Sequence, residues 1–424
     1  MSSLDVSWVR SQFPALAQEV NGQTAAFFDG PGGTQVPLRV IDAIRDYLIH
    51  SNANTHGAFA TARRTERLLA GAHAAAADLL GCDPSEIVFG PNMTTLTFAL
   101  SRALGRELSA GDEIVVTQLD HDANVAPWKA LQENGIAARV ADFDPADCTL
   151  DMDSLRRQIT ERTRLVAAGF ASNAVGTIND VTAIAQMAHD AGAMLFVDAV
   201  HYVPHRAVDV RAINCDFLAC SAYKFFGPHV GILYGKAGHL TRLRPYKVRP
   251  APDSIPGRWE TGTQNHEGLA GFIAAVDYLA ELGARRPPGE SASAPRATDR
   301  RPALLRAMQV IREYESVLCE RLVAGLLAIP GLTFYGIREP SRFDRRTPTV
   351  SIRIGDAHPR EIAEFLAAKG IFVWDGNYYA ISVTERLGVE SKGGMVRIGL
   401  AHYNTAEEVD RLLQALREFA SRLR

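Results

Sequence analysis

Residues 214–228 read NCDFLACSAYKFFGP, an apolar, strand-like run that ends in a lysine and is followed by two aromatic residues and a Gly-Pro turn. The lysine, Lys224, is therefore expected at the end of a strand, with its amine partly removed from water. Desolvation lowers the pKa of a lysine and leaves more of its amine uncharged and nucleophilic. This placement favours Schiff-base chemistry at Lys224.

A carboxylate ends the preceding apolar run, MLFVDA at residues 194–199. The interval from Asp198 to Lys224 (224 − 198 = 26 residues) leaves room for one connection and one further strand. An acid at one strand end and an amine at the next suit pyridoxal phosphate, because the acid keeps the pyridine nitrogen protonated and the lysine carries the cofactor as an imine. The sequence predicts this cofactor, with Lys224 and Asp198 as catalytic residues.

Composition narrows the class of protein. The chain has 424 residues, 47% hydrophobic and 22% charged, with a net charge of −3, which suits two globular domains and gives no reason to expect nucleic acid or a membrane as partner. No basic-then-apolar leader and no apolar run of membrane-spanning length is seen, so neither a signal peptide nor a membrane span is expected. Five scattered cysteines without a CxxC pair favour a cytoplasmic location over a disulfide or zinc framework.

Strand and helix patterns alternate through the first two thirds of the chain. This alternation predicts an α/β fold with a mostly parallel, seven-stranded sheet and functional residues at the carboxyl ends of its strands. The predicted strands are 86–89, 113–117, 137–141, 165–170, 194–197, 217–221 and 231–234. The predicted helices are 36–49, 62–80, 92–104, 123–134, 152–159 and 181–191.

A change of composition suggests a domain boundary. Residues 285–301, RRPPGESASAPRATDRR, are expected to form a mobile loop, although a surface insertion without a role is the plain alternative. We expect an N-terminal arm (1–30) associated with the small domain, a large cofactor-binding domain (31–284) and a smaller α+β C-terminal domain (302–424). The small domain is expected to contain helices 302–328, 359–369 and 405–421 and strands 349–354 and 395–400.

Residues 89–95, FGPNMTT, follow a strand and open a helix. Backbone N–H groups at a helix N-terminus bind phosphate, so the Met93 amide and the Thr94 hydroxyl are predicted to hold the cofactor's phosphate. The plain alternative is a helix N-cap, for which Asn and Thr are common.

Two further strand ends carry polar residues. His121 in QLDHDANVAPW (118–128) could stack on a planar cofactor and move protons. A solvated loop or a metal cluster at residues 120–122 is the alternative, but no third ligand lies at a sensible spacing, so no metal site is predicted. Asn173 in FASNAVGT (170–177) could hydrogen-bond the cofactor's phenolic oxygen, as could His201, while an Asx turn is the plain role for Asn173.

In combination these motifs resemble the class V aminotransferase family of fold-type-I pyridoxal phosphate enzymes, specifically its cysteine desulfurase-like branch. The resemblance runs from FFDGPGG (27–33) to RIGLAHYNT (397–405). The family's Schiff-base lysine ends a Ser-x-His-Lys run, which is similar to residues 221–224, with Ser221 kept and Tyr223 in place of the His beside the phosphate. The resemblance implies that His121 stacks on the cofactor ring, that Asp198 faces the pyridine nitrogen and that His201 replaces the usual Gln.

The resemblance also implies a dimer and a substrate site. WETGTQN (259–265) is similar to the segment that reaches the phosphate of the neighbouring subunit, which implies a homodimer with Gly262 and Thr263 as cofactor contacts. Arg397 matches the arginine that pairs with the carboxylate of an amino-acid substrate. Its plain alternative is a surface salt bridge. Gly32 and Tyr379 are expected beside Arg397 in the substrate site.

One departure bears on the reaction. The loop that carries the sulfur-accepting cysteine in cysteine desulfurases is similar to WDGNYYA (374–380), where Tyr379 takes the cysteine's place, and no cysteine follows Cys319. The resemblance therefore implies chemistry at Cα of an amino acid, of the C–S lyase or desulfurase type but without the catalytic cysteine. Lys224 is expected to take the Cα proton. An aminotransferase and an epimerase or racemase are the alternatives.

Two other classes of function are alternatives. Ser221-x-x-Lys224 could form the dyad of a serine acyl hydrolase, but the companion motifs Ser-Asp-Asn and Lys-Thr-Gly do not occur. A binding or regulatory protein that keeps the cofactor without turnover is the remaining alternative.

Overall fold

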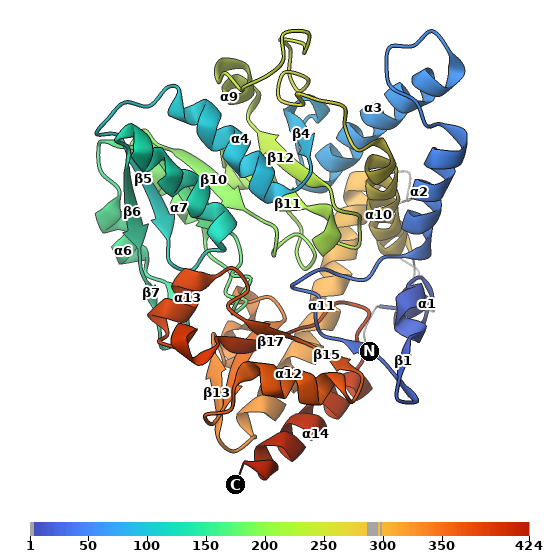
Figure 1. Cartoon of the computed structure of the whole chain (residues 1–424), viewed down its shortest axis with the longest axis vertical. Helices are drawn as coiled ribbons and strands as arrows, with labels where there is room; N and C mark the ends of the chain where they lie inside the picture. Colours follow the sequence, from blue (N-terminus) through green and yellow to red (C-terminus); the bar gives the residue numbers. More distant parts are fainter. Residues whose placement is uncertain (1–3, 286–295, 297–298, 424) are drawn as a thin grey trace.

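The computed structural model describes residues 4–285, 296 and 299–423. Most of the loop predicted at 285–301 therefore lies outside the described residues. Figure 1 shows a larger part built on a central sheet and a smaller part, coloured orange to red, that carries the C-terminus.

The central sheet has seven strands in the order β4-β12-β11-β10-β9-β5-β6. Only β12 runs antiparallel to its neighbours, so the predicted mostly parallel, seven-stranded sheet is confirmed. The strands are β4 (Ile87–Gly90), β5 (Glu113–Thr117), β6 (Ala137–Ala141), β9 (Thr163–Gly169), β10 (Met194–Asp198), β11 (Phe217–Ser221) and β12 (Gly231–Gly235).

Helices cover both faces of this sheet, which explains why its strands read as continuous apolar runs. Along β10, Leu195 and Val197 join the hydrophobic core on one face, while Phe196 joins the core on the other. The first face is covered by α3 (Ala60–Leu80), α7 (Val181–Asp190) and α10 (His266–Ala284), and the second by α4 (Met93–Gly105). Helix α2 (Leu38–His50) packs on α10, and the shorter helices are α6 (Met152–Gln158), α8 (Val210–Ile213) and α9 (Ala237–Arg242).

Two helix assignments differ from expectation. The single helix predicted at 123–134 is wrong, because the chain there forms two 3-10 turns around the short helix α5 (Ala126–Lys129). Pro127 lies in the first turn of α5 and Val125 before it has non-helical dihedral angles, so the helix cannot extend backwards. Helix α10 was not anticipated.

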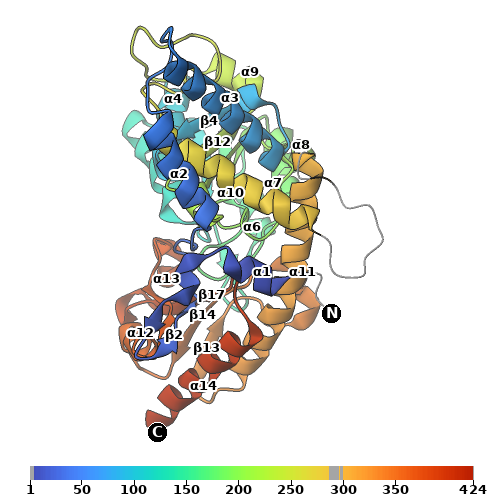
Figure 2. The same ribbon diagram turned by 90° about the vertical axis from the view of Figure 1, so that its right-hand side faces the viewer.

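The smaller part contains a four-stranded antiparallel sheet in the order β13-β14-β17-β16, with its own hydrophobic core. Helix α11 runs from the larger part into the smaller one (Figure 2), and its first half joins the core of the large part. The elements are α11 (Arg300–Leu327), β13 (Leu332–Tyr335), β14 (Thr349–Ile354), α12 (Pro359–Ala367), β16 (Trp374–Gly376), α13 (Ile381–Arg386), β17 (Met395–Gly399) and α14 (Ala406–Arg422). The domain boundaries stay a prediction.

The N-terminal segment lies against the smaller part. Arg10, in α1 (Val6–Ser11), pairs with Glu408 at 2.8 Å, and β3 (Ala26–Phe27) pairs in parallel with β15 (Ile371–Phe372). Two small hairpins, β1 (Glu19–Val20) with β2 (Gln23–Thr24) and β7 (Phe143–Asp144) with β8 (Thr149–Leu150), complete the strands. No helix within the described residues is long and apolar enough to cross a membrane.

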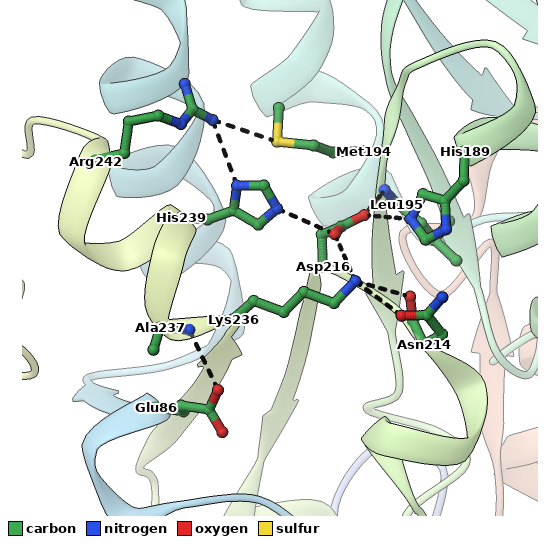
Figure 3. Close-up of polar contacts among 10 residues, drawn as sticks. All are labelled: Glu86, His189, Met194, Leu195, Asn214, Asp216, Lys236, Ala237, His239 and Arg242. Atoms are coloured by element: carbon green, nitrogen blue, oxygen red, sulfur yellow. Dashed lines mark hydrogen bonds and ion pairs between the residues drawn. The ribbon is translucent and has the colours of Figure 1, made fainter.

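A buried carboxylate fastens the amino-terminal end of the large sheet (Figure 3). Asp216, just before β11, accepts hydrogen bonds from the Leu195 amide and His189 at 2.8 Å and from His239 at 3.1 Å, and it pairs with Lys236 at 2.8 Å. Burial alone would raise the pKa of Asp216, but these hydrogen bonds outweigh it and hold the pKa well below its usual range. This network stabilises the end of the sheet opposite Lys224.

Candidate active site

A cavity lies at the carboxyl ends of the parallel strands, where sheets of this kind bind their ligands. It encloses about 550 Å³ of space, part of it open to solvent. Every residue predicted from these strand ends lines it: Met93, Thr94, His121, Asn173, Asp198, His201, Ser221, Tyr223 and Lys224. Pro31, Asp120 and Gly169 also lie in its wall.

Lys224 ends a 3-10 turn after β11. Its Nζ donates a hydrogen bond to the carbonyl oxygen of Pro31 and lies 4.9 Å from the centre of the Tyr223 ring. Burial lowers the pKa of Lys224 to about 7, the charge of Arg397 acts in the same direction, and Asp198 opposes both. About half of the amine is therefore an uncharged nucleophile at neutral pH.

Two buried carboxyl groups face the cavity. Asp198 accepts a hydrogen bond from the Val200 amide at 2.9 Å, and burial raises its pKa to about 6. Burial, and after it the charge of Asp198, raises the pKa of Asp120 to about 8. Of the two groups, Asp198 is therefore the one that is ionised at neutral pH. Asp120 is a site residue that the sequence analysis missed. Its position after β5 and directly before His121 could have indicated it.

His121 caps the 3-10 turn that follows β5. Its Nδ1 accepts a hydrogen bond from the Ala123 amide at 3.0 Å, so Nδ1 carries no proton and the neutral ring has its proton on Nε2. Burial lowers the pKa of His121 to about 4, with the charges of Lys224 and Arg397 acting in the same direction. A neutral, flat ring is therefore held at the cavity wall.

Tyr379 lies against this ring rather than in the cavity wall itself. The two rings stack with centroids 5.6 Å apart and planes 24° apart. Tyr378 and Tyr379 both have φ of +58°, a left-handed conformation that costs about 1–2 kcal/mol per residue. Asn173 Nδ2 donates to the Tyr378 carbonyl at 2.9 Å and the Asp122 amide donates to the Tyr379 carbonyl at 2.7 Å, and these bonds hold the bend against the large part.

Arg397, on β17, lies against Asn173, a residue of the cavity wall. Its side chain is buried, Nη1 donates to the Asn173 carbonyl at 2.9 Å, and its guanidinium lies 4.3 Å from the centre of the Tyr378 ring. Within the described residues no carboxylate lies within 4.0 Å of it, so the alternative role in a surface salt bridge is wrong, and its Nε has no hydrogen-bond partner. Burial lowers the pKa of Arg397 to about 10.

The N-terminus of α4 lies in the cavity wall. The Met93 amide donates to the buried Ser221 hydroxyl at 3.0 Å, while Asn92 caps the helix by accepting from the Thr95 amide at 2.8 Å. Asn92 rather than Thr94 caps the helix, and Thr94 is exposed. Ser221 ends β11 and is followed by a single 3-10 turn rather than the α-helix that an acyl hydrolase dyad needs, so that alternative is wrong.

Five predicted site residues do not line this wall, namely Arg397, Tyr379, Gly262, Thr263 and Gly32. Gly262 and Thr263 are exposed in the segment before α10. Gly32 lies against Trp374, and a Cβ there would come within 2.1 Å of the indole nitrogen, so any larger residue would have to displace this ring. His201 Nε2 lies 3.2 Å from the hydroxyl of Thr347, a contact from the distant C-terminal third that no local sequence signal could have indicated.

The residues present fit pyridoxal phosphate. The cavity combines an amine of lowered pKa, an ionised carboxylate, a flat neutral ring and a helix N-terminus beside a hydroxyl. In addition, Asn173 Oδ1 is buried without a hydrogen-bond partner among the described residues, so it is available to a bound group. No three His, Cys, Asp or Glu side chains in the described part of the chain are grouped to hold a metal ion.

Comparison with known proteins agrees with this site. Residues 26–293 and 305–412 match the family described as Aminotransferase class-V. The chain is 32% identical to a cysteine desulfurase of Pectobacterium atrosepticum and 33% identical to the aminotransferase-like protein FGM3 of Gibberella zeae, in each case over 98% of both chains.

Solved structures agree as well. The apo structure of cysteine desulfurase from Thermococcus onnurineus has a TM-score of 0.86 and 25% identity, over 99% of this chain and 100% of that one. Cysteine desulfurase CsdA from Escherichia coli has a TM-score of 0.82 and 26% identity, over 99% of both chains. The chain therefore belongs to the aminotransferase class-V family, as a pyridoxal phosphate-dependent enzyme of the cysteine desulfurase-like kind.

Proposed function

We propose that this enzyme acts at Cα of an amino acid through a Schiff base on Lys224, with cysteine desulfurase-like C–S lyase chemistry but without a sulfur-accepting cysteine. The observation that carries the proposal is the Lys224 amine, of lowered pKa, in one cavity with the ionised Asp198. An aminotransferase and an epimerase or racemase are the alternatives within the same site.

Each residue has a defined task in this proposal. When bound, the cofactor supplies an electron sink for charge that develops at Cα. Lys224 would hold the cofactor at its aldehyde carbon, and its amine, with a pKa of about 7, could take or return a proton at Cα. Asp198 keeps the pyridine nitrogen protonated, and His121 supplies a flat ring for stacking.

The remaining polar groups are assigned to the cofactor's phosphate, to its phenolic oxygen and to the substrate's carboxylate. The Met93 amide, Thr94, Ser221 and Tyr223 bind the phosphate at the N-terminus of α4. Asn173 and His201 bind the phenolic oxygen. Arg397 binds the substrate's α-carboxylate through its unpartnered Nε edge, with Gly32 and Tyr379 beside it.

The cysteines support the absence of a persulfide step. All five lie in described residues, none lines the cavity, and four are buried. Burial raises the pKa of each thiol, to about 12 for Cys82 and Cys148. A buried, protonated thiol is a poor nucleophile, so the group that leaves the substrate's β-carbon departs without attachment to the protein.

We further propose a cytoplasmic homodimer that takes an amino acid as substrate and binds neither nucleic acid nor membrane. Two observations support self-association. Gly262 and Thr263 are exposed and do not line the cavity that contains Lys224. Helix α2 and the segment after it also expose large apolar side chains, namely Leu38, Ile41, Leu48, Ile49 and Phe59.

The test combines spectroscopy with a panel of amino acids. Lys224→Ala should remove the visible absorption of the purified protein, whereas Lys392→Ala, at an exposed lysine outside the cavity, should keep it. Released sulfide with a keto acid identifies a lyase, inversion of configuration identifies a racemase or epimerase, and a keto acid from one half-reaction identifies an aminotransferase. A protein that keeps the band and turns over none of the panel is the idle binding protein, and a band that survives Lys224→Ala refutes the proposal.

A further inference from the structure

Asp29 lies beside Arg397 although sequence patterns gave it no role. Its backbone forms a bridge to Gly399 at the end of β17, and the Gly399 amide donates to the Phe28 carbonyl at 2.8 Å. The Asp29 carbonyl accepts from the Gly32 amide at 2.8 Å and from the Trp374 indole at 3.2 Å. Backbone contacts therefore fix the residue, and its carboxyl group is not needed to hold the chain in place.

The carboxyl group of Asp29 and the guanidinium of Arg397 are neighbours of opposite charge that form no ion pair in the described structure. Side chains two residues apart in a strand share a face, so Arg397 lies on the same face as Gly399, next to Asp29. Each group influences the charge of the other, yet in the described structure they are more than 4.0 Å apart. Asp29 Oδ1 and Arg397 Nε are both buried and neither has a hydrogen-bond partner among the described residues.

Because the two opposite charges stay apart, an unpartnered acceptor and an unpartnered donor remain that a third group could satisfy. A carboxylate would satisfy Arg397 Nε, but it would then meet the negative charge of Asp29. Like charges in a buried place favour protonation of one of them. Burial already raises the pKa of Asp29 to about 6, with the charge of Arg397 acting against it, so the cost of adding a proton near neutral pH is small.

The other titratable groups near Asp29 and Arg397 are not expected to take up this proton. Tyr403 faces Asp29 from the segment after β17, and burial, followed by the charge of Asp29, raises the pKa of its phenol, so it stays neutral. Tyr378 and Tyr223 face Arg397, and burial raises their pKa values too. The amine of Lys224 is held at the Pro31 carbonyl. Among the described residues, Arg397 is the cation that acts on Asp29.

We infer that Asp29 is a positioning residue that balances the charge of Arg397 in the substrate-free site and takes up a proton when a carboxylate binds Arg397. The inference rests on the proposed role of Arg397 in binding the α-carboxylate. Its consequence has a definite sign. Affinity for a carboxylate is highest where Asp29 is protonated and falls as pH rises through and above 6, by at most tenfold per pH unit.

The experiment uses the cofactor-loaded protein and propionate, a carboxylate that has no amine and cannot react with the cofactor. Calorimetry at pH 7 in two buffers of different ionisation enthalpy measures the protons taken up on binding. The wild type should take up a substantial fraction of one proton, and its Kd should rise about threefold to thirtyfold between pH 6 and pH 8. Asp29→Asn should take up fewer protons and bind propionate more tightly than the wild type at pH 8.

Two controls separate this role from a structural one. Asp375→Asn removes a carboxylate on β16 that pairs with Arg360 at 3.0 Å, and it should behave as the wild type does. Propionamide, the neutral analogue, should bind the wild type without proton uptake, and this measurement does not depend on whether Asp29→Asn folds. Equal uptake with propionate and propionamide, or equal uptake in the wild type and a folded Asp29→Asn, would overturn the inference.

The outcome also separates this inference from the proposed function. A protein with no visible cofactor band that still takes up a proton with propionate would refute the proposed function and keep the role of Asp29. A protein that has the visible band but takes up no proton with propionate would refute the role of Asp29 and keep the proposed function.

Discussion

The amine of Lys224 should titrate near neutral pH. Its pKa is lowered from 10.5 to about 7, chiefly by burial. At pH 7 about half of this amine is uncharged, whereas an ordinary lysine has only about one amine in 3,000 in that form, a difference of roughly 1,500-fold in reactive species. Cofactor-free protein should therefore form its bond with added pyridoxal phosphate with a pH midpoint near 7.

Two variants should move this midpoint in opposite directions. Arg397→Gln removes a nearby positive charge, which makes the ammonium form less costly and raises the pKa of Lys224. Asp198→Asn removes a negative charge that favours the ammonium, and so lowers it. A shift of about half to one pKa unit in each direction is expected for single charges at this range.

The assay follows the growth of the visible band after cofactor-free protein and pyridoxal phosphate are mixed, at a series of pH values. Lys224→Ala serves as the blank, and pyridoxal without its phosphate shows whether phosphate binding contributes to the pH profile. A midpoint near 10 in the wild type, or shifts of both variants in the same direction, would refute the electrostatic account of this lysine.

Three further outcomes are expected. Asp216→Asn should lower the free energy of unfolding in urea at pH 7 by about 1–3 kcal/mol, because it removes the charged acceptor of the half-buried Lys236, His189 and His239, and the difference should shrink as pH falls through the depressed pKa of Asp216; an unchanged free energy contradicts this. Tyr379→Cys should yield a protein persulfide that thiol-specific reagents trap after incubation with cysteine, while the wild type yields none; trapping on the wild type contradicts the missing acceptor. Arg397→Ala should raise KM for α-carboxylate substrates about 10- to 100-fold with a smaller effect on kcat, and an unchanged KM removes it from the site.

The strand ends were predictable from sequence because parallel strands carry a strong local signal. Each buried strand is a short apolar run, and the polar residue that follows it, such as Asp198 or Lys224, must lie at a common edge of the sheet. The broken helix around Pro127 shows the limit of this approach, since periodicity at 123–134 favoured a helix that one proline and its neighbour interrupt.

The residues that were missed depend on contacts between distant segments. Asp29 comes to lie near Arg397 only because β17, far along the chain, pairs beside it. Thr347 contacts the site only because its hydroxyl reaches His201. Asp120 has the same strand-end signal as Asp198, but its raised pKa comes from burial beside that second carboxyl group. Burial and the pairing of charges are properties of the folded chain, so a single sequence could not supply them.

The covalent link between Lys224 and the cofactor is tested most directly by borohydride reduction of the loaded protein followed by peptide mapping. Reduction fixes the bond between a lysine and the cofactor's aldehyde carbon, so the labelled peptide identifies the lysine. The account predicts the label on the peptide that contains Lys224 and on no other. Fully loaded protein that carries the label on a different lysine, or on none, would contradict it.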